Sequence, residues 1–399
     1  MTSQQTTGYA ILGAGIFAKE AYLPSLKNIS GTSALSLKAV YSRSKSSASS
    51  LAETAVTTLS LSAPPDVYHD DGPTLDDLLS RPDISSILIM LPITTQPSIV
   101  LKCLSHNKHV LSEKPVAPSI AEAKEIIRTY ETKYKPKGLL WRVAENWSTE
   151  PGFLKSRDVI AAGTIGRVHT FEARAAGYVD VDNKWYKTPW RTVPDYQGGF
   201  LLDGGVHTAA ALRVILPAIP TSLSSFSSLS FAHLAPADSI LAILQTAPQP
   251  ASSDEPQHPD HPVDTSIRGT LHISFSGPAN APSSLSEIGP SNSITLTGTL
   301  GWLNVRFTPE GKQRVTVYKV KKVQEGDDKG KIEGVEESVV YEEKPSGVEK
   351  ELERFFAAVS GTEKEDVQNP REALWDVAVI EASLKSGGQK LELAELIAM

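Results

Sequence analysis

The stretch YAILGAGIFA, residues 9–18, decides the fold. A short apolar run ends at two glycines, and a helical pattern follows at once. In such a strand-turn-helix unit, Gly13 permits a tight turn and Gly15 lets the backbone approach a pyrophosphate. Ile16 and Phe17 then open a helix whose free N–H groups face the phosphates. The stretch predicts a dinucleotide-binding loop, and a glycine turn that serves only packing is the alternative.

Beyond this stretch, short apolar runs alternate with helical patterns as far as residue 147. Such alternation is typical of a parallel sheet covered by helices on both faces. One helix has a clear start, because Ser119 and Glu122 form a capping-box pattern. We expect strands at 9–12, 35–41, 86–91, 109–112 and 138–147, and helices at 16–28, 44–55, 74–80, 96–107 and 119–134. The fold class is therefore α/β, with a doubly wound N-terminal Rossmann sheet.

The residues after the second expected strand bear on the choice of cofactor. NAD-binding proteins place an acidic residue there, on the ribose hydroxyls. This chain has Ser42 and Arg43 instead, with Lys45 just beyond. A hydroxyl and a guanidinium suit a 2′-phosphate, which Arg pairs through charge-assisted hydrogen bonds. The sequence predicts NADP, with NAD as the second choice, and solvated loop charges are the alternative reading of the two cations.

The pattern changes after residue 163, where polar and apolar residues begin to alternate. Alternating runs separated by turn residues are typical of an antiparallel sheet with one face exposed to solvent. We expect strands at 167–179, 265–275, 292–307, 314–323 and 337–343. The second half is therefore expected to be an α+β domain with an open, largely antiparallel sheet.

These patterns suggest two domains. Residues 1–145 form the predicted NAD(P)-binding Rossmann domain, and residues 146–399 form the predicted substrate-binding and oligomerisation domain. Helices at 348–360 and 370–387 are expected to pack back on the first domain or on the sheet. Residues 245–262, rich in Pro, Ser and acids, read as an exposed loop insertion.

Composition narrows the class of protein. The 399 residues carry a formal net charge of -7, which argues against nucleic acid as a partner. The single cysteine, Cys103, permits no intrachain disulfide and suits a reducing compartment. Without a signal-like start or a long apolar run, we expect a cytoplasmic protein that binds no membrane. His258 and His261 have no third ligand nearby in the sequence, so no metal is expected.

Four motifs occur in a fixed order: GAGIFA at 13–18, SEKPVA at 112–117, GTIGRV at 163–168 and GGFLLDGGVHTAAAL at 198–212. Together they resemble the glucose-fructose oxidoreductase / inositol dehydrogenase / rhizopine catabolism family of NAD(P)-dependent oxidoreductases. The resemblance implies a Rossmann domain followed by a domain whose open sheet commonly mediates oligomerisation. It also implies a small-molecule substrate and a homo-oligomer, a dimer or a tetramer.

The resemblance implies roles for several residues of these motifs. Lys114 matches the lysine that lines the nicotinamide site and bonds the reacting substrate oxygen. Glu113 and Pro115 shape that turn, and the X–Pro bond at Pro115 can be cis. Asp203 matches the substrate-binding acid, and His207 matches the general acid/base.

Further positions are implied to line the cofactor or the substrate. Pro92 and Thr94 fall in the cofactor cradle after the fourth strand, where the histidine usual in the family is missing. Asn146 lies where many members of the family have a motif with an asparagine and an arginine, and its side chain is implied to reach the substrate. Trp185, Trp190 and Arg191 precede the DGGVH motif in an aromatic loop. They are expected to stack on a substrate ring or to cap the site, although core packing suits the tryptophans nearly as well.

The residue types fit hydride-transfer chemistry. Oxidising an alcohol requires a base and a positive group near one oxygen, besides the nicotinamide. Histidine titrates near neutrality, and a carboxylate four residues earlier on a helix lies on the same face and orients it. The alternatives are that Asp203 caps the helix, that His207 is a core histidine and that Lys114 is a surface lysine. The two glycines between Asp203 and His207 would let the backbone approach a ligand.

The sequence thus predicts an NADP-dependent oxidoreductase acting on a sugar, a polyol or a related hydroxyl or carbonyl compound. Two other functions stay open. One is a non-catalytic regulator of the same fold that senses NAD(P). The other is a reductase of an imine or a conjugated double bond in a biosynthetic pathway.

Overall fold

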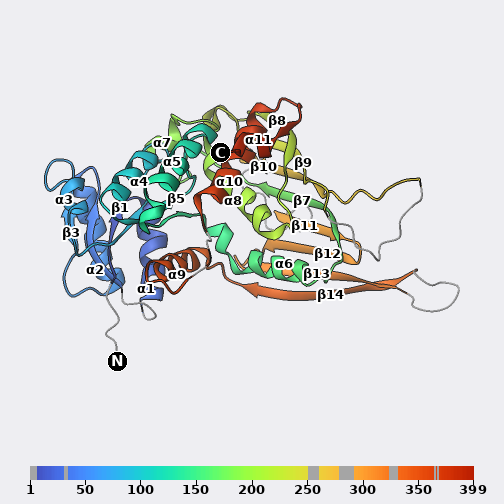
Figure 1. Ribbon diagram of the computed structural model, residues 1–399, viewed down its shortest axis with the longest axis horizontal. Coiled ribbons are helices and arrows are strands. Elements are labelled where there is room, and N and C mark those ends of the chain that lie inside the picture. The colour runs from blue at the N-terminus through green and yellow to red at the C-terminus, as the bar shows by residue number, and fades with distance from the viewer. Residues whose placement is uncertain are drawn as a thin grey trace. The chain divides into compact units, whose positions relative to one another are not determined.

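The computed structural model describes residues 7–30, 35–249, 260–277, 292–322, 331–363, 365 and 368–399. The chain divides into two compact units (Figure 1). The first unit comprises residues 1–149, 346–377 and 399, and the second comprises residues 150–345 and 378–398.

The first unit is built on a six-stranded sheet with the order β3-β2-β1-β4-β5-β6. All neighbouring strands run parallel. The strands are β1 (Thr7–Leu12), β2 (Leu35–Tyr41), β3 (Asp66–Tyr68), β4 (Ser86–Ile89), β5 (His109–Glu113) and β6 (Trp141–Ala144). This is the strand order of a doubly wound dinucleotide-binding fold, so the predicted fold class is confirmed. Strand β3 was not among the predicted ranges.

The helices of this unit are the connections between these strands, which lie near the predicted places, and one helix from farther along the chain. They are η1 (Ala18–Tyr22), α1 (Leu23–Ile29), α2 (Lys45–Leu59), α3 (Leu75–Leu79), α4 (Gln96–Ser105), α5 (Ile120–Lys133), η2 (Lys135–Lys137), η3 (Asn146–Thr149) and α9 (Gly347–Val359). The first helix differs from the regular one predicted at 16–28, because η1 is a π-helical turn. Helix α5 begins as predicted, since the Ser119 hydroxyl accepts a hydrogen bond from the Glu122 backbone N–H.

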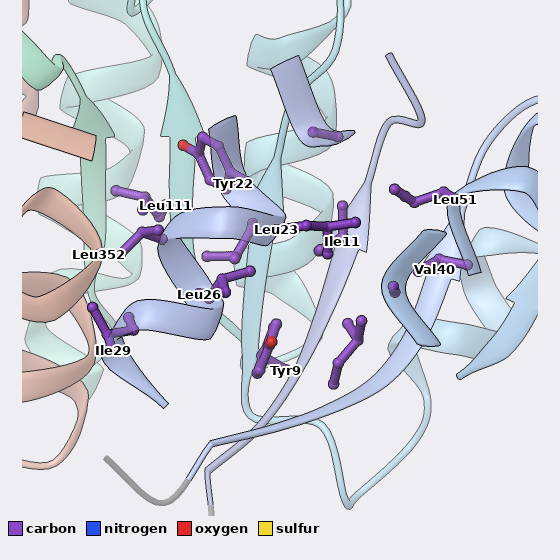
Figure 2. Close-up of a cluster of buried hydrophobic side chains, with 14 of the residues drawn as sticks. Tyr9, Ile11, Tyr22, Leu23, Leu26, Ile29, Val40, Leu51, Leu111 and Leu352 are labelled. Carbon is purple, nitrogen blue, oxygen red and sulfur yellow. The ribbon is translucent and has the colours of Figure 1, made fainter. Parts of the chain in front are cut away.

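A buried apolar cluster joins the start of the chain to its C-terminal part (Figure 2). Tyr9 and Ile11 of β1 lie beside Leu26 of α1, and Leu352 of α9 belongs to the same cluster. Phe356 of α9 also packs on Tyr9, with ring centroids 5.4 Å apart. Burying each of these side chains contributes roughly 1.5–3 kcal/mol. Helix α9 therefore completes the core under β1 although it lies far along the chain.

The second unit contains a nine-stranded sheet with the order β14-β13-β12-β11-β7-β10-β9-β8-β15. Only the β7–β10 pair is parallel among the described pairings. The strands are β7 (Val168–Ala176), β8 (Ser222–Ser228), β9 (Ser239–Gln245), β10 (Arg268–Ser274), β11 (Ser293–Gly298), β12 (Gly301–Phe307), β13 (Gln313–Lys322), β14 (Ile332–Glu343) and β15 (Leu391–Glu392). The largely antiparallel sheet confirms the predicted α+β class, while β8, β9 and β15 were missed.

One face of this sheet is covered by helices. The remaining helices are α6 (Pro151–Ala161), α7 (Pro189–Thr192), α8 (Phe200–Ile215), η4 (Ala232–Leu234), α10 (Pro370–Lys385) and α11 (Leu393–Ile397). Helix α8 packs on β7 and β10, and α6 packs on β12 and β13. A Cβ atom on Gly204 would lie 2.6 Å from the Phe275 ring, and one on Gly205 would lie 2.9 Å from Ile380. The two glycines of the DGGVH motif thus allow α8 to pack closely on its neighbours.

The opposite face of the sheet exposes apolar side chains. Phe226, Leu241 and Ile243 are 69%, 57% and 62% exposed. Phe226 of β8 lies directly across from Leu241 of β9, so their side chains share one face. Farther along the sheet, Trp302 and Tyr318 stack with ring centroids 5.1 Å apart. We call the surface formed by these five residues the open face.

Some expectations fall outside the described residues. His258, and most of the loop insertion expected at 245–262, lie within the undescribed range 250–259. In the part of the chain that is described, no group of three or more His, Cys, Asp and Glu side chains is placed to hold a metal ion. Among the same residues, no helix combines the length and the apolar character needed to span a membrane.

Candidate functional site

The glycine loop after β1 has the geometry of a nucleotide-binding turn. Gly13 has φ +108, and a Cβ atom there would lie 2.1 Å from the carbonyl oxygen of Met90. No other residue type fits this turn without backbone movement. A Cβ atom on Gly15 would meet nothing within 4 Å, so the backbone at Gly15 borders open space. Helical backbone starts at Ile16 and Phe17, and their place in its first turn suits a bound phosphate.

The predicted phosphate-binding residues follow β2. The backbone N–H of Ser42 donates to the carbonyl oxygen of Tyr68 (3.3 Å), and the N–H of Asp70 donates to the carbonyl oxygen of Arg43 (3.2 Å). The loops after β2 and β3 are therefore held together. Arg43 is exposed, and its guanidinium has no ion pair among the described residues. Lys45 is the first residue of α2.

An acidic residue that the sequence analysis did not select stands beside this loop. The hydroxyl of Tyr41, the last residue of β2, donates a 2.5 Å hydrogen bond to the Asp70 carboxylate. Burial and this hydrogen bond raise the pKa of Tyr41 to about 12, while the nearby charge of Arg43 lowers it. Asp70 follows β3, the short strand that the sequence analysis missed, and lies in the same loop pair as Arg43.

The segment after β4 holds the predicted residues Pro92 and Thr94. The carbonyl oxygen of Pro92 accepts the backbone N–H groups of Thr95 (2.9 Å) and Gln96 (3.2 Å), which forms the turn into α4. Gln96 is 1% exposed, and neither atom of its side-chain amide has a hydrogen-bond partner among the described residues. A buried amide without a partner costs about 1–3 kcal/mol. Gln96 is therefore a polar group at this edge that sequence reasoning did not select.

The EKP turn follows β5. Glu113 is buried, and its carboxylate accepts a 2.7 Å hydrogen bond from the hydroxyl of Tyr22. Burial raises the pKa of Glu113 to about 7, against the opposing charge of Lys114 and the Tyr22 hydrogen bond, while buried Glu145 adds to the rise. The Lys114–Pro115 peptide bond is cis, as its place in the motif allows.

The topology brings these segments to one edge of the first sheet. Each follows the carboxyl end of a parallel strand, and open α/β sheets bind their ligands at that edge. The predicted residues there are Gly13 and Gly15 after β1, Ser42 and Arg43 after β2, Pro92 and Thr94 after β4, Glu113 at the end of β5, Lys114 next to it, and Asn146 after β6. The carbonyl oxygen of Asn146 accepts the hydroxyl of Thr149 (3.0 Å) in the turn η3. Open space at Gly15 and an exposed guanidinium at Arg43 fit a dinucleotide.

Helix α8 of the second unit carries the other predicted residues. It begins at Phe200, with Gly199 at the N-cap at φ 50 and ψ -128, a backbone conformation that favours glycine. Asp203 therefore lies inside the helix, and the alternative that it caps the helix is wrong. Asp203 is buried, and His207 follows one turn later on the same face.

Arg191, in the aromatic loop before α8, forms an ion pair with Asp203. Arg191 Nε donates a 2.7 Å hydrogen bond to Asp203 Oδ2, and the two side chains are only 14% and 7% exposed. A second guanidinium nitrogen donates to the hydroxyl of Thr188 (3.2 Å). The Arg191 guanidinium lies 4.0 Å from the Trp190 ring centroid and 5.6 Å from that of Trp185. The structure thus brings both predicted tryptophans to Arg191, which itself pairs with Asp203. Arg191 therefore occupies aromatic surface that was expected to face a substrate ring.

Comparison with known proteins identifies both units. Residues 7–136 match the family model of the oxidoreductase family with an NAD-binding Rossmann fold. Residues 153–304 match the GFO/IDH/MocA C-terminal domain. A dehydrogenase of Fusarium mangiferae is 35% identical over 386 residues, which cover 95% of this chain and 96% of that protein.

Solved structures share the architecture. An oxidoreductase from Thermotoga maritima superposes with a TM-score of 0.76 and 26% identity, covering 98% of this chain and 100% of that chain. A levoglucosan dehydrogenase solved with NADH has a TM-score of 0.70 and 16% identity over 98% of this chain and 99% of that chain, a likeness of fold. The chain therefore belongs to the glucose-fructose oxidoreductase / inositol dehydrogenase / MocA family, whose members are NAD(P)-dependent oxidoreductases.

Proposed function

We propose that this protein is an NADP-dependent oxidoreductase that transfers a hydride between nicotinamide and a sugar, a polyol or a related hydroxyl or carbonyl compound. One observation carries the proposal. Lys114 follows β5, at the edge of the sheet where this fold binds dinucleotides, and α8 of the other unit carries Asp203 and His207 one turn apart. These are the residue types that an alcohol–carbonyl interconversion needs.

The roles follow from the chemistry of each side chain. His207 takes the hydroxyl proton in oxidation and returns it in reduction, because a neutral imidazole accepts a proton on one ring nitrogen and an imidazolium can give it back. The ammonium group of Lys114 holds the reacting oxygen and stabilises its alkoxide character. Asp203 accepts a hydrogen bond from the substrate while Arg191 holds its carboxylate. Nicotinamide, when bound at the first sheet, supplies the hydride acceptor or donor.

A turnover assay tests the proposal. Purified protein is given NADP with polyols, aldoses and anhydrosugars, and NADPH with the matching ketones and aldehydes. We expect turnover with members of the sugar or polyol group. Binding of NADPH with no turnover on any compound would favour the regulator alternative. Turnover only on imines or conjugated double bonds would favour the biosynthetic reductase instead.

The cofactor preference depends on Arg43. Arg43→Ala is expected to weaken NADPH binding by roughly 10- to 100-fold, the value of one charged hydrogen bond, and to leave NADH binding unchanged. Arg128→Ala, at an exposed arginine of α5, is the matched control. Titration of cofactor fluorescence measures both affinities. Equal NADPH affinity in Arg43→Ala and wild type would exclude Arg43 as a ligand of the 2′-phosphate. Tighter binding of NADH than of NADPH by the wild type would show a preference for NAD.

We also propose that the open face joins copies of this chain into a dimer or a tetramer. Exposed apolar surface on a regular sheet is typical of subunit interfaces, and Phe226, Leu241 and Ile243 form such a surface. Ile243→Glu should reduce the solution mass measured by light scattering to that of one chain, because the glutamate would lose its hydration in the interface. Val193→Glu, at a 77% exposed residue off the sheet, is the control. An unchanged mass for Ile243→Glu would exclude the open face as the interface.

A further inference from the structure

Tyr22 joins the helix after the glycine loop to the EKP turn. It is the last residue of η1, the π-helical turn in which the backbone N–H of Leu23 bonds the carbonyl oxygen of Ala18. Its side chain is fully buried, and its hydroxyl donates a 2.7 Å hydrogen bond to Glu113 Oε1, 91 residues away. π-helical turns are rare and occur frequently at functional sites. Tyr22 belongs to none of the four motifs, yet it binds a residue of one of them.

Two further carboxyl groups lie near this hydrogen bond. Glu145, directly after β6, and Glu351 of α9 are both buried in the same unit. The charge of Glu145 raises the pKa of Glu113. Burial and the charges of Glu113 and Glu351 raise the pKa of Tyr22 well above its usual value. The phenol therefore keeps its proton and is the donor of the bond.

The ionised form of Glu113 attracts its neighbour Lys114. Burial, against the opposing charge of Lys114, raises the pKa of Glu113 to about 7, so this carboxyl changes its charge near neutral pH. A hydrogen bond donated to a carboxylate favours its charged form, so Tyr22 keeps more of Glu113 ionised. The lysine ammonium stands on a flexible four-carbon stem, and a neighbouring carboxylate restrains it by charge attraction. A protonated Glu113 exerts no such attraction.

We propose that Tyr22 is a positioning residue of the EKP turn, whose hydroxyl keeps the Glu113 carboxylate ionised and thereby holds the Lys114 ammonium in place for the reacting oxygen. The inference rests on the proposed function, in which Lys114 binds that oxygen. Tyr22 acts through Glu113 and, being fully buried, needs no contact with substrate or cofactor. Loosening a group that must align with a reacting atom lowers the rate even when every catalytic group remains.

Tyr22→Phe tests the inference, because it removes the hydroxyl and keeps the ring. One hydrogen bond to a charged group corresponds to a shift of about 1–2 pH units in the ionisation of Glu113. On a sugar or polyol that the wild type turns over, we expect kcat/KM at neutral pH to fall roughly 5- to 50-fold, because Glu113 is then mostly protonated. The ratio of variant to wild type should return to within about twofold of one near pH ~9.5, where Glu113 ionises in both proteins. Titrations of other groups are common to both proteins and leave this ratio unchanged.

Glu113→Gln gives the complementary result, because an amide of nearly the same shape cannot ionise. Its kcat/KM relative to wild type should fall as the pH rises, the reverse of Tyr22→Phe, since only the wild type gains a carboxylate. Adding Tyr22→Phe to Glu113→Gln should change kcat/KM by less than about twofold, because the phenol then has no carboxylate to act on.

Tyr130→Phe is the matched control for the loss of a buried hydroxyl in the first unit. The hydroxyl of Tyr130 donates to the carbonyl oxygen of Leu139 and accepts the backbone N–H of Trp141, so its bonds are to the backbone. Its removal should leave the ratio of kcat/KM to wild type independent of pH.

A ratio for Tyr22→Phe that does not change with pH, whether at one or below it, would overturn the inference and leave the proposed function standing. The same pH-dependent ratio in Tyr130→Phe would overturn it as well. If Tyr22→Phe does not fold, Glu113→Gln decides, and a pH-independent ratio for that variant overturns the inference. If the wild type turns over no sugar or polyol at all, the proposed function fails, and the inference fails with it.

Discussion

His207→Ala is expected to lower kcat by about 100- to 10,000-fold, the usual contribution of a general acid/base. The side chain lies on α8 one turn after the buried carboxylate of Asp203, and alanine keeps the helix while removing the imidazole. Because the cofactor residues lie in the other unit, NADPH affinity should stay at the wild-type value. Steady-state kinetics and a cofactor titration on the same sample measure the two quantities.

A control variant shows whether the loss of a histidine elsewhere in the second unit also lowers kcat. His261→Ala removes an exposed imidazole of the second unit and should leave kcat unchanged. A kcat within threefold of wild type in His207→Ala would show that another group moves the proton.

Arg191→Met is expected to destabilise the protein by about 3–5 kcal/mol, because it leaves the Asp203 carboxylate buried without its cation. The pair is nearly inaccessible to solvent, with side chains 14% and 7% exposed and a 2.7 Å separation. The variant also removes a guanidinium 4.0 Å from the Trp190 ring. Urea unfolding monitored by tryptophan fluorescence measures the loss of stability.

The double variant Arg191→Met, Asp203→Asn separates charge balance from catalysis. With no buried charge left, its unfolding free energy should recover most of the loss seen in Arg191→Met. Its kcat/KM should remain low, because the substrate-binding carboxylate is gone. A loss below about 1 kcal/mol in Arg191→Met would mean that the pair behaves like an exposed surface ion pair.

The Rossmann unit was predictable because its signals are local. Apolar runs and helical spacings alternate along residues 9–134, and the glycine turn at Gly13 requires a backbone that only glycine adopts. Strand β3 was not predictable from its own three residues, DVY. It forms because β2 offers it a parallel hydrogen-bonding edge, with Ala39 opposite Asp66.

Strands β8 and β9 were missed for a different reason. Strand β8 reads SLSSFSS, in which serine supplies little of the β-propensity that marks a strand. Strand β9 reads SILAILQ, and its outward residues are apolar, so the alternation of polar and apolar residues is absent. That same departure from the pattern produces the exposed Leu241 and Ile243 of the open face.

At the candidate site, the sequence indicates residue types and order but not the contacts between distant positions. The Tyr22–Glu113 hydrogen bond joins residues 91 apart, and no periodic signal predicts it. Arg191 and Asp203 were both selected, yet their pairing depends on the path of the loop between them. The sequence also gives no sign that Tyr196 is buried with an unpaired hydroxyl, because both facts depend on the packing around it.

Transfer of deuterium from the cofactor tests the central claim most directly. The wild-type protein is incubated with NADPH deuterated at C4 of the nicotinamide, in separate samples for each face, together with a carbonyl sugar that it reduces. Mass spectrometry then locates the label in the product. The account predicts one deuterium on the former carbonyl carbon from one face only. Deuterium that stays in the cofactor or passes to water in both samples, while product forms, would contradict hydride transfer as the function of this protein.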